Sequence, residues 1–252
     1  MSHRKFTIPW RHKRIVPLKK MAPLKSSLTI FLGPMYAGKT TEMASQCHLY
    51  AKAERSSIIV KYAGDTRYSD KEEVVTHDQE KYVACSALKL SDVLDTLLQH
   101  EVIGIDEGSF YPDIVPVVKT LLQNNKVVII SILDGAYTGD VFSMPNILLM
   151  MEYQKLAALP DPMESLLFLR DNLQALTTSW TSLIPLADNV IKCHGVCSCC
   201  GTMGSGMTLK INPGNGQVVD IGGDEKYITA CRACWWENGN GSGQYHPLAN
   251  SI

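Results

Sequence analysis

The segment that most constrains this chain is residues 33–40, Gly-Pro-Met-Tyr-Ala-Gly-Lys-Thr, which directly follows an apolar run. This pattern is typical of a phosphate-binding loop (P-loop) between a strand and a helix, with the lysine on the β- and γ-phosphates and the threonine hydroxyl on Mg²⁺. Glycines let the backbone approach a triphosphate closely, and the amides and the helix N-terminus then face its oxygens. We therefore expect ATP contacts from Gly33, Pro34, Met35, Tyr36, Ala37, Gly38, Lys39 and Thr40.

Strand-like and helix-like segments alternate through the first 140 residues. Strands are predicted at 28–32, 57–62, 102–105 and 126–133, and helices at 41–53, 91–99 (with Ser91 as N-cap) and 112–124. Such alternation predicts an α/β domain with a mostly parallel sheet covered by helices on both faces. Ligands of such sheets bind beyond the carboxyl ends of the strands. The P-loop, Asp106–Glu107 and Asp134–Gly135 all follow strands, so we expect them to converge.

Two adjacent acids, Asp106 and Glu107, end the apolar run 102–105. An acid in this position, in a chain with a P-loop, is the usual partner of Mg²⁺. Neighbouring side chains leave a strand on opposite faces, so the two carboxylates are expected to divide the work. One would hold the metal, and the other would accept a proton from an attacking hydroxyl. The alternative is a helix N-terminus that merely carries acids.

Two Cys-x-x-Cys pairs lie in the last quarter of the chain. Four thiolates in two such pairs fit a tetrahedral Zn²⁺, and a site with four protein ligands is structural because it has no open position. Cys199 lies inside the first pair and is expected to be a bystander. The alternative is four unrelated cysteines. The predicted ligands are Cys197, Cys200, Cys231 and Cys234.

Charge is distributed unevenly along the chain. Residues 1–25 hold eight Lys or Arg and no acid, so we expect a basic, disordered tail. This tail is either a nuclear or organelle targeting signal or a solvated leader without a function. That tail lacks the apolar stretch of a secretory signal, and no run of 18 apolar residues suggests a membrane span. Eight cysteines without such a signal favour a reducing interior, hence a cytoplasmic protein that does not bind a membrane.

Changes in composition divide the chain into five expected parts. They are a basic tail (1–26), a nucleotide-binding domain (27–143), an irregular Leu- and Met-rich segment (144–180), a zinc-binding module (181–236) and a flexible tail (237–252).

Several motifs together resemble the type II thymidine kinase family, and they occur in the family's order. They are Gly-Pro-Met-Tyr-Ala-Gly-Lys-Thr-Thr-Glu (33–42), Val-Lys-Tyr-Ala-Gly-Asp-Thr-Arg-Tyr-Ser (60–69), Thr-His-Asp (76–78), Ile-Gly-Ile-Asp-Glu-Gly-Ser-Phe-Tyr-Pro-Asp-Ile (103–114), Leu-Asp-Gly-Ala-Tyr (133–137), Ile-Pro-Leu-Ala-Asp (184–188), Ile-Gly-Gly-Asp-Glu-Lys-Tyr (221–227) and both cysteine pairs. The resemblance covers roughly residues 27–143 and 180–236.

The resemblance implies a P-loop, RecA-like fold and transfer of the ATP γ-phosphate to the 5′-hydroxyl of thymidine or deoxyuridine, commonly by a homotetramer. Glu107 matches the catalytic base, helped by Lys39 and Arg67, and Thr40, Asp106 and Asp65 would lie at Mg²⁺. A lasso, residues 218–227, would grip the base through backbone atoms. The implied nucleoside contacts are Met35, Leu133, Tyr137, Phe142, Thr208, Val218, Asp220, Ile221, Gly222, Gly223 and Tyr227, with Asp220 standing where an apolar residue is expected.

Two departures keep alternatives open. Ser109 stands where the family usually has Gln, and about 36 residues from Met144 look inserted, so an impaired family member is one alternative. A second is a RecA-like nucleic-acid-binding ATPase with a zinc ribbon, which should carry a basic stripe. The zinc module is instead balanced, which disfavours a nucleic-acid partner: Lys192, Lys210, Lys226 and Arg232 stand against Asp188, Asp220, Asp224 and Glu225.

Overall fold

A computed structural model describes residues 22–64, 73–75, 81–141, 179–211 and 222–238. A seven-stranded sheet forms its centre, in the order β3-β4-β2-β5-β6-β1-β7, and all neighbouring strands except the β3–β4 pair are parallel. This confirms the predicted α/β class. The strands are β1 (Ser27–Gly33), β2 (Ser57–Tyr62), β3 (Glu73–Val75), β4 (Lys81–Ala87), β5 (Val102–Ile105), β6 (Val127–Leu133) and β7 (Asn189–Lys192).

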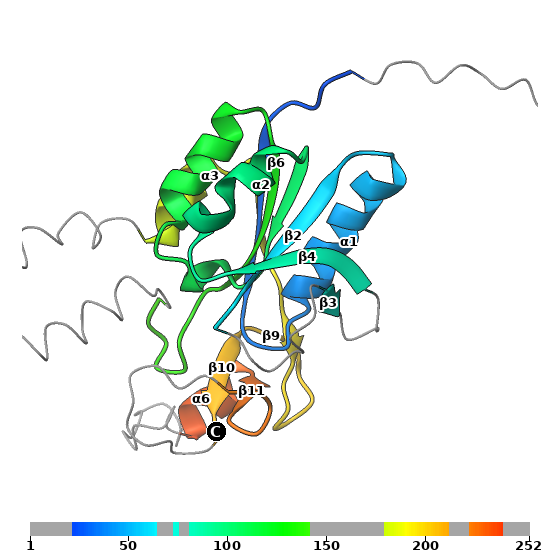
Figure 1. The fold of residues 1–252 in the computed structure, drawn as a ribbon. Coiled ribbons are helices and arrows are strands. Elements are labelled where there is room, and N and C mark those ends of the chain that lie inside the picture. Colours follow the sequence, from blue (N-terminus) through cyan, green and yellow to red (C-terminus); the bar gives the residue numbers. More distant parts are fainter. Residues whose placement is uncertain (1–21, 65–72, 76–80, 142–178, 212–221, 239–252) are drawn as a thin grey trace, which may run out of the picture.

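Helices cover both faces of this sheet (Figure 1). Helix α1 (Lys39–Lys52) packs on one face, where its Met43 and Cys47 join a core cluster with Phe31 of β1. The opposite face carries the larger of the two core clusters, which includes Leu28 and Ile30. It is covered by α2 (Leu94–Leu98), α3 (Ile114–Gln123) and the 3₁₀ helices η1 (Leu90–Val93) and η3 (Trp180–Leu186). Strands β5 and β6 are buried along their whole length, as expected for parallel strands between two helical layers.

The start of the second helical segment differs from the prediction. Ser91 is not an N-cap, because the segment begins as η1 at Leu90 and no side chain of its own caps it. The carboxylate of Asp113 instead accepts from the amides of Leu90 and Ser91, at 3.1 and 2.8 Å. Asp113 is also the residue before α3, so the third predicted helix begins at Ile114 rather than at Pro112.

Strand β7 lies in the sheet although its residues belong to the range expected for the zinc module. It pairs in parallel with β1, from Thr29–Asn189 to Leu32–Lys192. Trp180 and Leu183 of η3 are likewise part of the main core. The large domain is therefore built from both sides of segment 144–180, most of which lies outside the described residues.

A smaller module lies beyond the carboxyl edge of the sheet (Figure 1). It consists of two antiparallel pairs, β8 (Gly195–Val196) with β9 (Met203–Ser205) and β10 (Met207–Lys210) with β11 (Tyr227–Ala230), followed by α6 (Arg232–Glu237). Leu209, Ala230 and Trp235 form its own small core together with Cys197 and Cys234.

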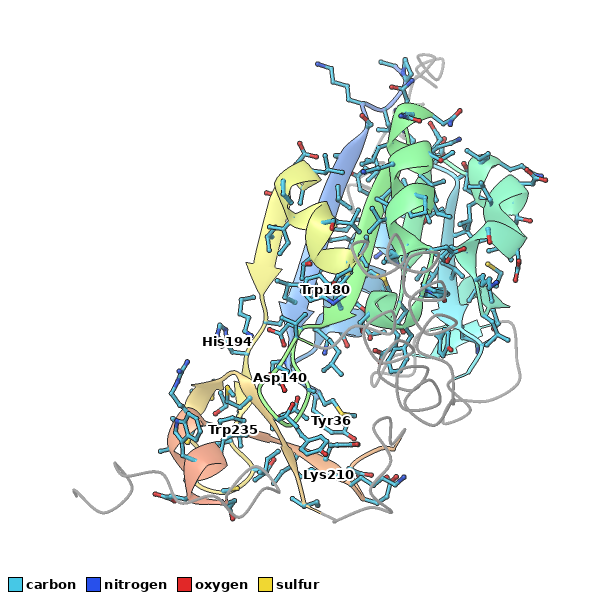
Figure 2. The ribbon with its side chains drawn as sticks, turned by 90° about the vertical axis from the view of Figure 1, so that its left-hand side faces the viewer. Tyr36, Asp140, Trp180, His194, Lys210 and Trp235 are labelled. Atoms are coloured by element: carbon cyan, nitrogen blue, oxygen red, sulfur yellow. The ribbon has the colours of Figure 1, made fainter. Side chains whose placement is uncertain are left out.

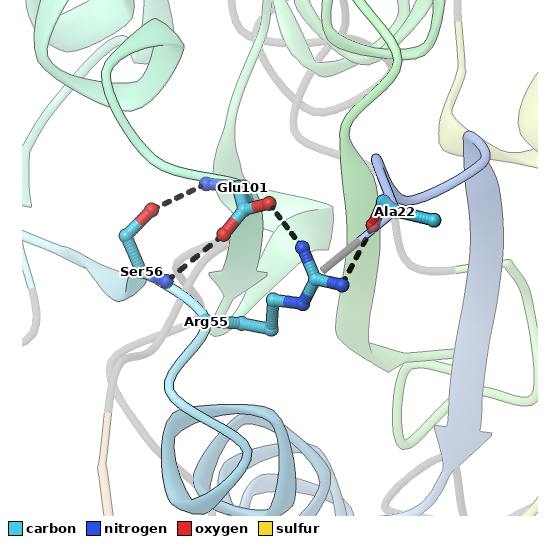
Figure 3. Close-up of polar contacts among 4 residues, drawn as sticks. All are labelled: Ala22, Arg55, Ser56 and Glu101. Carbon is cyan, nitrogen blue, oxygen red and sulfur yellow. Dashed lines mark hydrogen bonds and ion pairs between the residues drawn. The ribbon is translucent and has the colours of Figure 1, made fainter. Parts of the chain in front are cut away.

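At the amino ends of the parallel strands, Arg55 binds the segment that precedes β1 (Figure 3). Its guanidinium donates to Glu101 at 2.8 Å and to the carbonyl of Ala22 at 2.7 Å. The amide of Glu101 also donates to the Ser56 hydroxyl at 3.0 Å, and the amide of Ser56 donates to the Glu101 carboxylate at 3.4 Å. These contacts join the starts of β1, β2 and β5 at the end of the sheet opposite the P-loop.

Candidate active site

The P-loop connects β1 to α1, as predicted. Gly33 has φ 152°, and a Cβ at this position would lie 2.6 Å from the carbonyl oxygen of Cys193, so a larger residue would push β1 away from the chain that follows β7. Gly38 precedes α1 in the left-handed conformation, φ 77°, which glycine adopts without strain. The loop therefore leads directly into the helix N-terminus that an anion would face.

Lys39 is buried, with 9% of its surface exposed, and its ammonium group donates to the carbonyl of Pro34 at 2.7 Å. Burial lowers the pKa of Lys39, and the carboxylates of Glu107, Asp134 and Asp106 oppose that change. The side chains of the P-loop lysine and of the acids after β5 and β6 thus act on one another in one site. The predicted convergence of these three strand ends is confirmed.

Thr40 and Asp106 are directly hydrogen bonded, Oγ1 to Oδ1, at 2.8 Å. The same carboxylate oxygen accepts from Ser131 Oγ at 2.5 Å. A hydroxyl and a carboxylate are the oxygen ligands that a P-loop site offers to Mg²⁺. The described residues of the predicted magnesium site therefore fit that ion, whereas Asp65 lies outside the described residues.

Glu107 follows Asp106 in the left-handed conformation, φ 52° and ψ 44°, which is uncommon for a residue with a side chain. Its amide donates to Ser131 Oγ at 3.3 Å, and its carbonyl accepts from Phe110 at 3.0 Å. Gly108 comes next, where a Cβ would lie 2.6 Å from Ile130, so the turn packs tightly on β6. The turn separates the two acids, and one hydroxyl, Ser131, contacts both.

The small module binds the P-loop through Met35. Thr208 Oγ1 accepts from the Met35 amide at 3.2 Å, and Thr229 Oγ1 donates to the Met35 carbonyl at 2.7 Å. Met35 and Thr208, both predicted nucleoside contacts, are therefore brought together. Thr229 is a further contact of Met35, and the sequence analysis missed it.

Tyr36 of the P-loop and Lys210 of the module lie where the sheet and the module meet (Figure 2). The rings of Tyr137 and Tyr227 are 6.4 Å apart, and the Lys210 ammonium lies 5.0 and 5.9 Å from their centroids. A Cβ on Gly223 would be 3.6 Å from the Tyr36 hydroxyl, so this residue of the expected lasso lies close to the P-loop. Leu133, the last residue of β6, and Gly222 are also described. Four other expected contacts, Phe142, Val218, Asp220 and Ile221, and the expected Arg67 lie outside the described residues.

The four predicted zinc ligands form one cluster. The sulfur atoms of Cys197, Cys200, Cys231 and Cys234 all lie within 4.8 Å of one another, and those of Cys200 and Cys231 are 3.7 Å apart. Tetrahedral Zn²⁺ with bonds of about 2.3 Å requires sulfurs about 3.8 Å apart, so the cluster fits zinc. Cys199 is exposed and does not belong to it.

Sequence analysis also missed an ion pair at the carboxyl ends of two strands. Lys192, the last residue of β7, pairs with Asp134, which follows β6. Because Asp134 is one of the three acids that act on Lys39, this pair belongs to the same charge network. Among the described residues, no helix is long and apolar enough to cross a lipid bilayer.

Comparison with known proteins agrees with this geometry. The thymidine kinase family model matches residues 26–159 and 170–235, so only residues 160–169 of the expected insertion fall outside the match. Cytosolic thymidine kinase of Gallus gallus is 32% identical over 213 residues, 84% of this chain and 78% of the chicken protein. The Homo sapiens cytosolic enzyme is 30% identical over 217 residues (86% and 76%), and thymidine kinase of Raccoon poxvirus is 29% identical over 208 (82% and 96%). The chain therefore belongs to the thymidine kinase family.

Proposed function

We propose that this protein transfers the γ-phosphate of ATP to the 5′-hydroxyl of thymidine, with deoxyuridine as a second acceptor. The observation that carries the proposal is the convergence of Lys39, Asp106 and Glu107, beside a P-loop whose Met35 is bound by the module's hairpin. Phosphoryl transfer depends mainly on positioning and on neutralising charge, and this arrangement supplies both. Family membership does not favour a nucleic-acid-binding ATPase or an impaired family member.

In the proposed reaction, the oxygen of the 5′-hydroxyl forms a bond to the γ-phosphorus, and Glu107 accepts the proton that this hydroxyl loses. The bond from that phosphorus to the β,γ-bridging oxygen breaks, and ADP leaves with the electron pair. Lys39 exchanges its contact with Pro34 for the phosphates, which restore favourable charge around a buried ammonium group. Thr40 and Asp106 would hold Mg²⁺, which neutralises phosphate charge when bound. By family resemblance, Asp65 and Arg67 assist at the metal and the phosphates.

Thymine would be held between the β6 end, the P-loop and the module. Leu133, Tyr137, Thr208 and Tyr227 come from elements that meet there, and Gly222 and Gly223 lie in the middle of the lasso, residues 218–227. Main-chain donors and acceptors from such a loop would read the pyrimidine edge. A closed loop would also exclude water from the transferred phosphate.

We further propose a homotetramer in the cytoplasm, because relatives are named cytosolic thymidine kinases and the family is commonly tetrameric. Strand β7 pairs only with β1 among the described strands, and its Val190 and Ile191 are 43% and 40% exposed. An apolar edge strand of this kind needs a cover. Light scattering on the purified protein measures the mass, and a monomer at micromolar concentration contradicts this part of the proposal.

The activity is tested by incubating the protein with thymidine and ATP labelled at its γ-phosphate, with and without Mg²⁺. We expect Mg²⁺-dependent label in thymidine 5′-monophosphate. ATP binding without labelled product would instead favour an impaired enzyme, in which case deletion of residues 160–169, which lie outside the family match, should restore transfer. ATP hydrolysis stimulated by single-stranded DNA, without thymidine phosphorylation, would favour the nucleic-acid-dependent ATPase.

A further inference from the structure

The indole N–H of Trp235 is shared between two backbone carbonyls. Trp235 Nε1 lies 3.1 Å from the oxygen of Tyr137 and 3.1 Å from that of Thr208, and its side chain is 3% exposed. An indole has a single donor, so this is a three-centre hydrogen bond. One buried donor thus joins the loop after β6 to strand β10, and both acceptors belong to residues proposed to contact the nucleoside.

The ring of Trp235 also packs against that loop, residues 134–141. A Cβ on Gly139, which has φ 89°, would lie 3.0 Å from the Trp235 ring, so the glycine lets the backbone lie directly on the indole. Within the loop, Ala136 donates to Asp140 at 2.8 Å and Gly139 donates to Ala136 at 3.0 Å. Figure 2 places Asp140 and Trp235 in this junction between sheet and module.

Trp235 is in turn tied to the cysteine cluster. It follows Cys234 directly in α6, and its own amide donates to the carbonyl of Cys231 at 2.9 Å. Its neighbours in the small core include Cys197 and Leu209. The backbone that carries the indole is therefore connected directly to two of the predicted zinc ligands, Cys231 and Cys234.

We propose that Trp235 is a positioning residue that couples the zinc cluster to nucleoside binding by holding Tyr137 against Thr208. The inference rests on the proposed function for its kinetic consequence. The two tyrosine rings beside Lys210 add a weaker contact between the same loop and the hairpin. The P-loop is bound to the hairpin by other atoms: the side-chain hydroxyls of Thr208 and Thr229 contact the backbone of Met35, whereas the indole contacts the Thr208 carbonyl.

The test compares Trp235→Phe, which keeps an aromatic side chain but removes the donor and the outer edge of the indole that lies on Gly139, with Trp236→Phe. Trp236 is the matched control, since it is the adjacent indole in α6, contacts the Trp235 ring and is 38% exposed. For Trp235→Phe we expect KM for thymidine to rise about ten-fold, because two carbonyls lose a shared donor. KM for ATP and bound zinc should stay within about two-fold of wild type, and the control should match wild type throughout.

Amide hydrogen exchange of the peptide that spans residues 134–141 is the second readout, and it needs no activity. We expect faster exchange in Trp235→Phe and in chelated wild type, and no change in Trp236→Phe. Unchanged exchange in Trp235→Phe, an equal rise of both KM values, or loss of zinc from that variant would overturn the inference. If wild type phosphorylates no thymidine, the proposed function fails, while the exchange comparison still decides whether Trp235 holds the loop.

Discussion

Thr208 and Thr229 are opposite each other on the β10–β11 hairpin, and their hydroxyls bind the two backbone polar groups of Met35. Both threonines are buried, at 5% and 3% exposure. This pair therefore fixes the P-loop to the module that carries the proposed nucleoside contacts. The phosphate donor and the acceptor would be held in register by two hydroxyl groups.

Removing one of these hydroxyls should displace Met35. We expect Thr229→Val, which keeps the shape of the side chain, to lower kcat/KM about ten-fold, since a buried carbonyl loses its partner at ~1–2 kcal/mol. Thr208→Val should act on the same backbone unit, so the double variant should lose clearly less than the sum of the two. Steady-state kinetics of this double-mutant cycle measure the effect, with Thr120→Val as control, because the half-buried Thr120 also donates to a backbone carbonyl, that of Pro116, but lies in α3. Strict additivity would mean that the two threonines act separately.

Replacing the proposed base should affect the chemical step rather than binding. Glu107→Gln retains the size of the side chain and removes its ability to accept a proton, so we expect kcat to fall by ~10²–10⁴. Thymidine affinity measured by calorimetry should remain within about three-fold of wild type. Glu237→Gln, an exposed acid in α6, serves as the control. Residual kcat above about a tenth of wild type would remove Glu107 from this role.

Ser131 offers a test of the link between the two acids. Ser131→Ala leaves the Glu107 amide without its acceptor and removes one of the two hydroxyl donors to Asp106, so we expect a loss of ~1–3 kcal/mol in unfolding free energy and about ten-fold in kcat. Ser205→Ala is the matched control, because Ser205 is equally buried and loses a hydrogen bond to Thr202 within the module. Urea unfolding and initial rates measure both effects. Equal kcat values for the two variants would show that Ser131 stabilises the fold without serving the site.

The cysteine cluster permits a comparison of adjacent residues. Cys200→Ser should lose bound zinc and unfold the small module, because its core of Leu209, Ala230 and Trp235 is too small to fold alone. Cys199→Ser should retain zinc, since Cys199 lies outside the cluster. Metal content by mass spectrometry and proteolysis of the module distinguish the two. Equal zinc content in both variants would contradict the ligand set.

The sequence predicted those strands that are buried on both faces. Residues 127–133 form an unbroken apolar run apart from Ser131, and β5 and β6 appear where that pattern indicates. Strand β7 could not be predicted in this way, because all four of its residues are exposed and its place depends on pairing with the distant β1. The Ser91 prediction failed for a similar reason: its amide is satisfied by Asp113, 22 residues away, and local pattern carries no information on such contacts.

The residues of the candidate site likewise divide into those that sequence motifs predicted and those that depend on the fold. Lys39, Thr40, Asp106, Glu107 and the zinc ligands occur in motifs whose spacing reflects their chemistry. Ser131 and Lys192 occur singly at strand positions, where a hydroxyl or a cation is unremarkable until the fold brings a carboxylate next to it. The one available signal for Ser131 was a hydroxyl inside an otherwise apolar strand. Thr229 and Trp235 carried no such signal, since their partners are backbone groups.

The anchoring of Ala22 by Arg55 has a practical consequence for handling the protein. The seven residues of strand β1, about 20 Å of extended chain, separate the anchored segment from the P-loop, so the two lie at opposite ends of the sheet. A purification handle or surface tether added upstream of residue 22 would leave at the pole remote from catalysis. Immobilised in this orientation, the protein would present its reacting edge to the bulk solution.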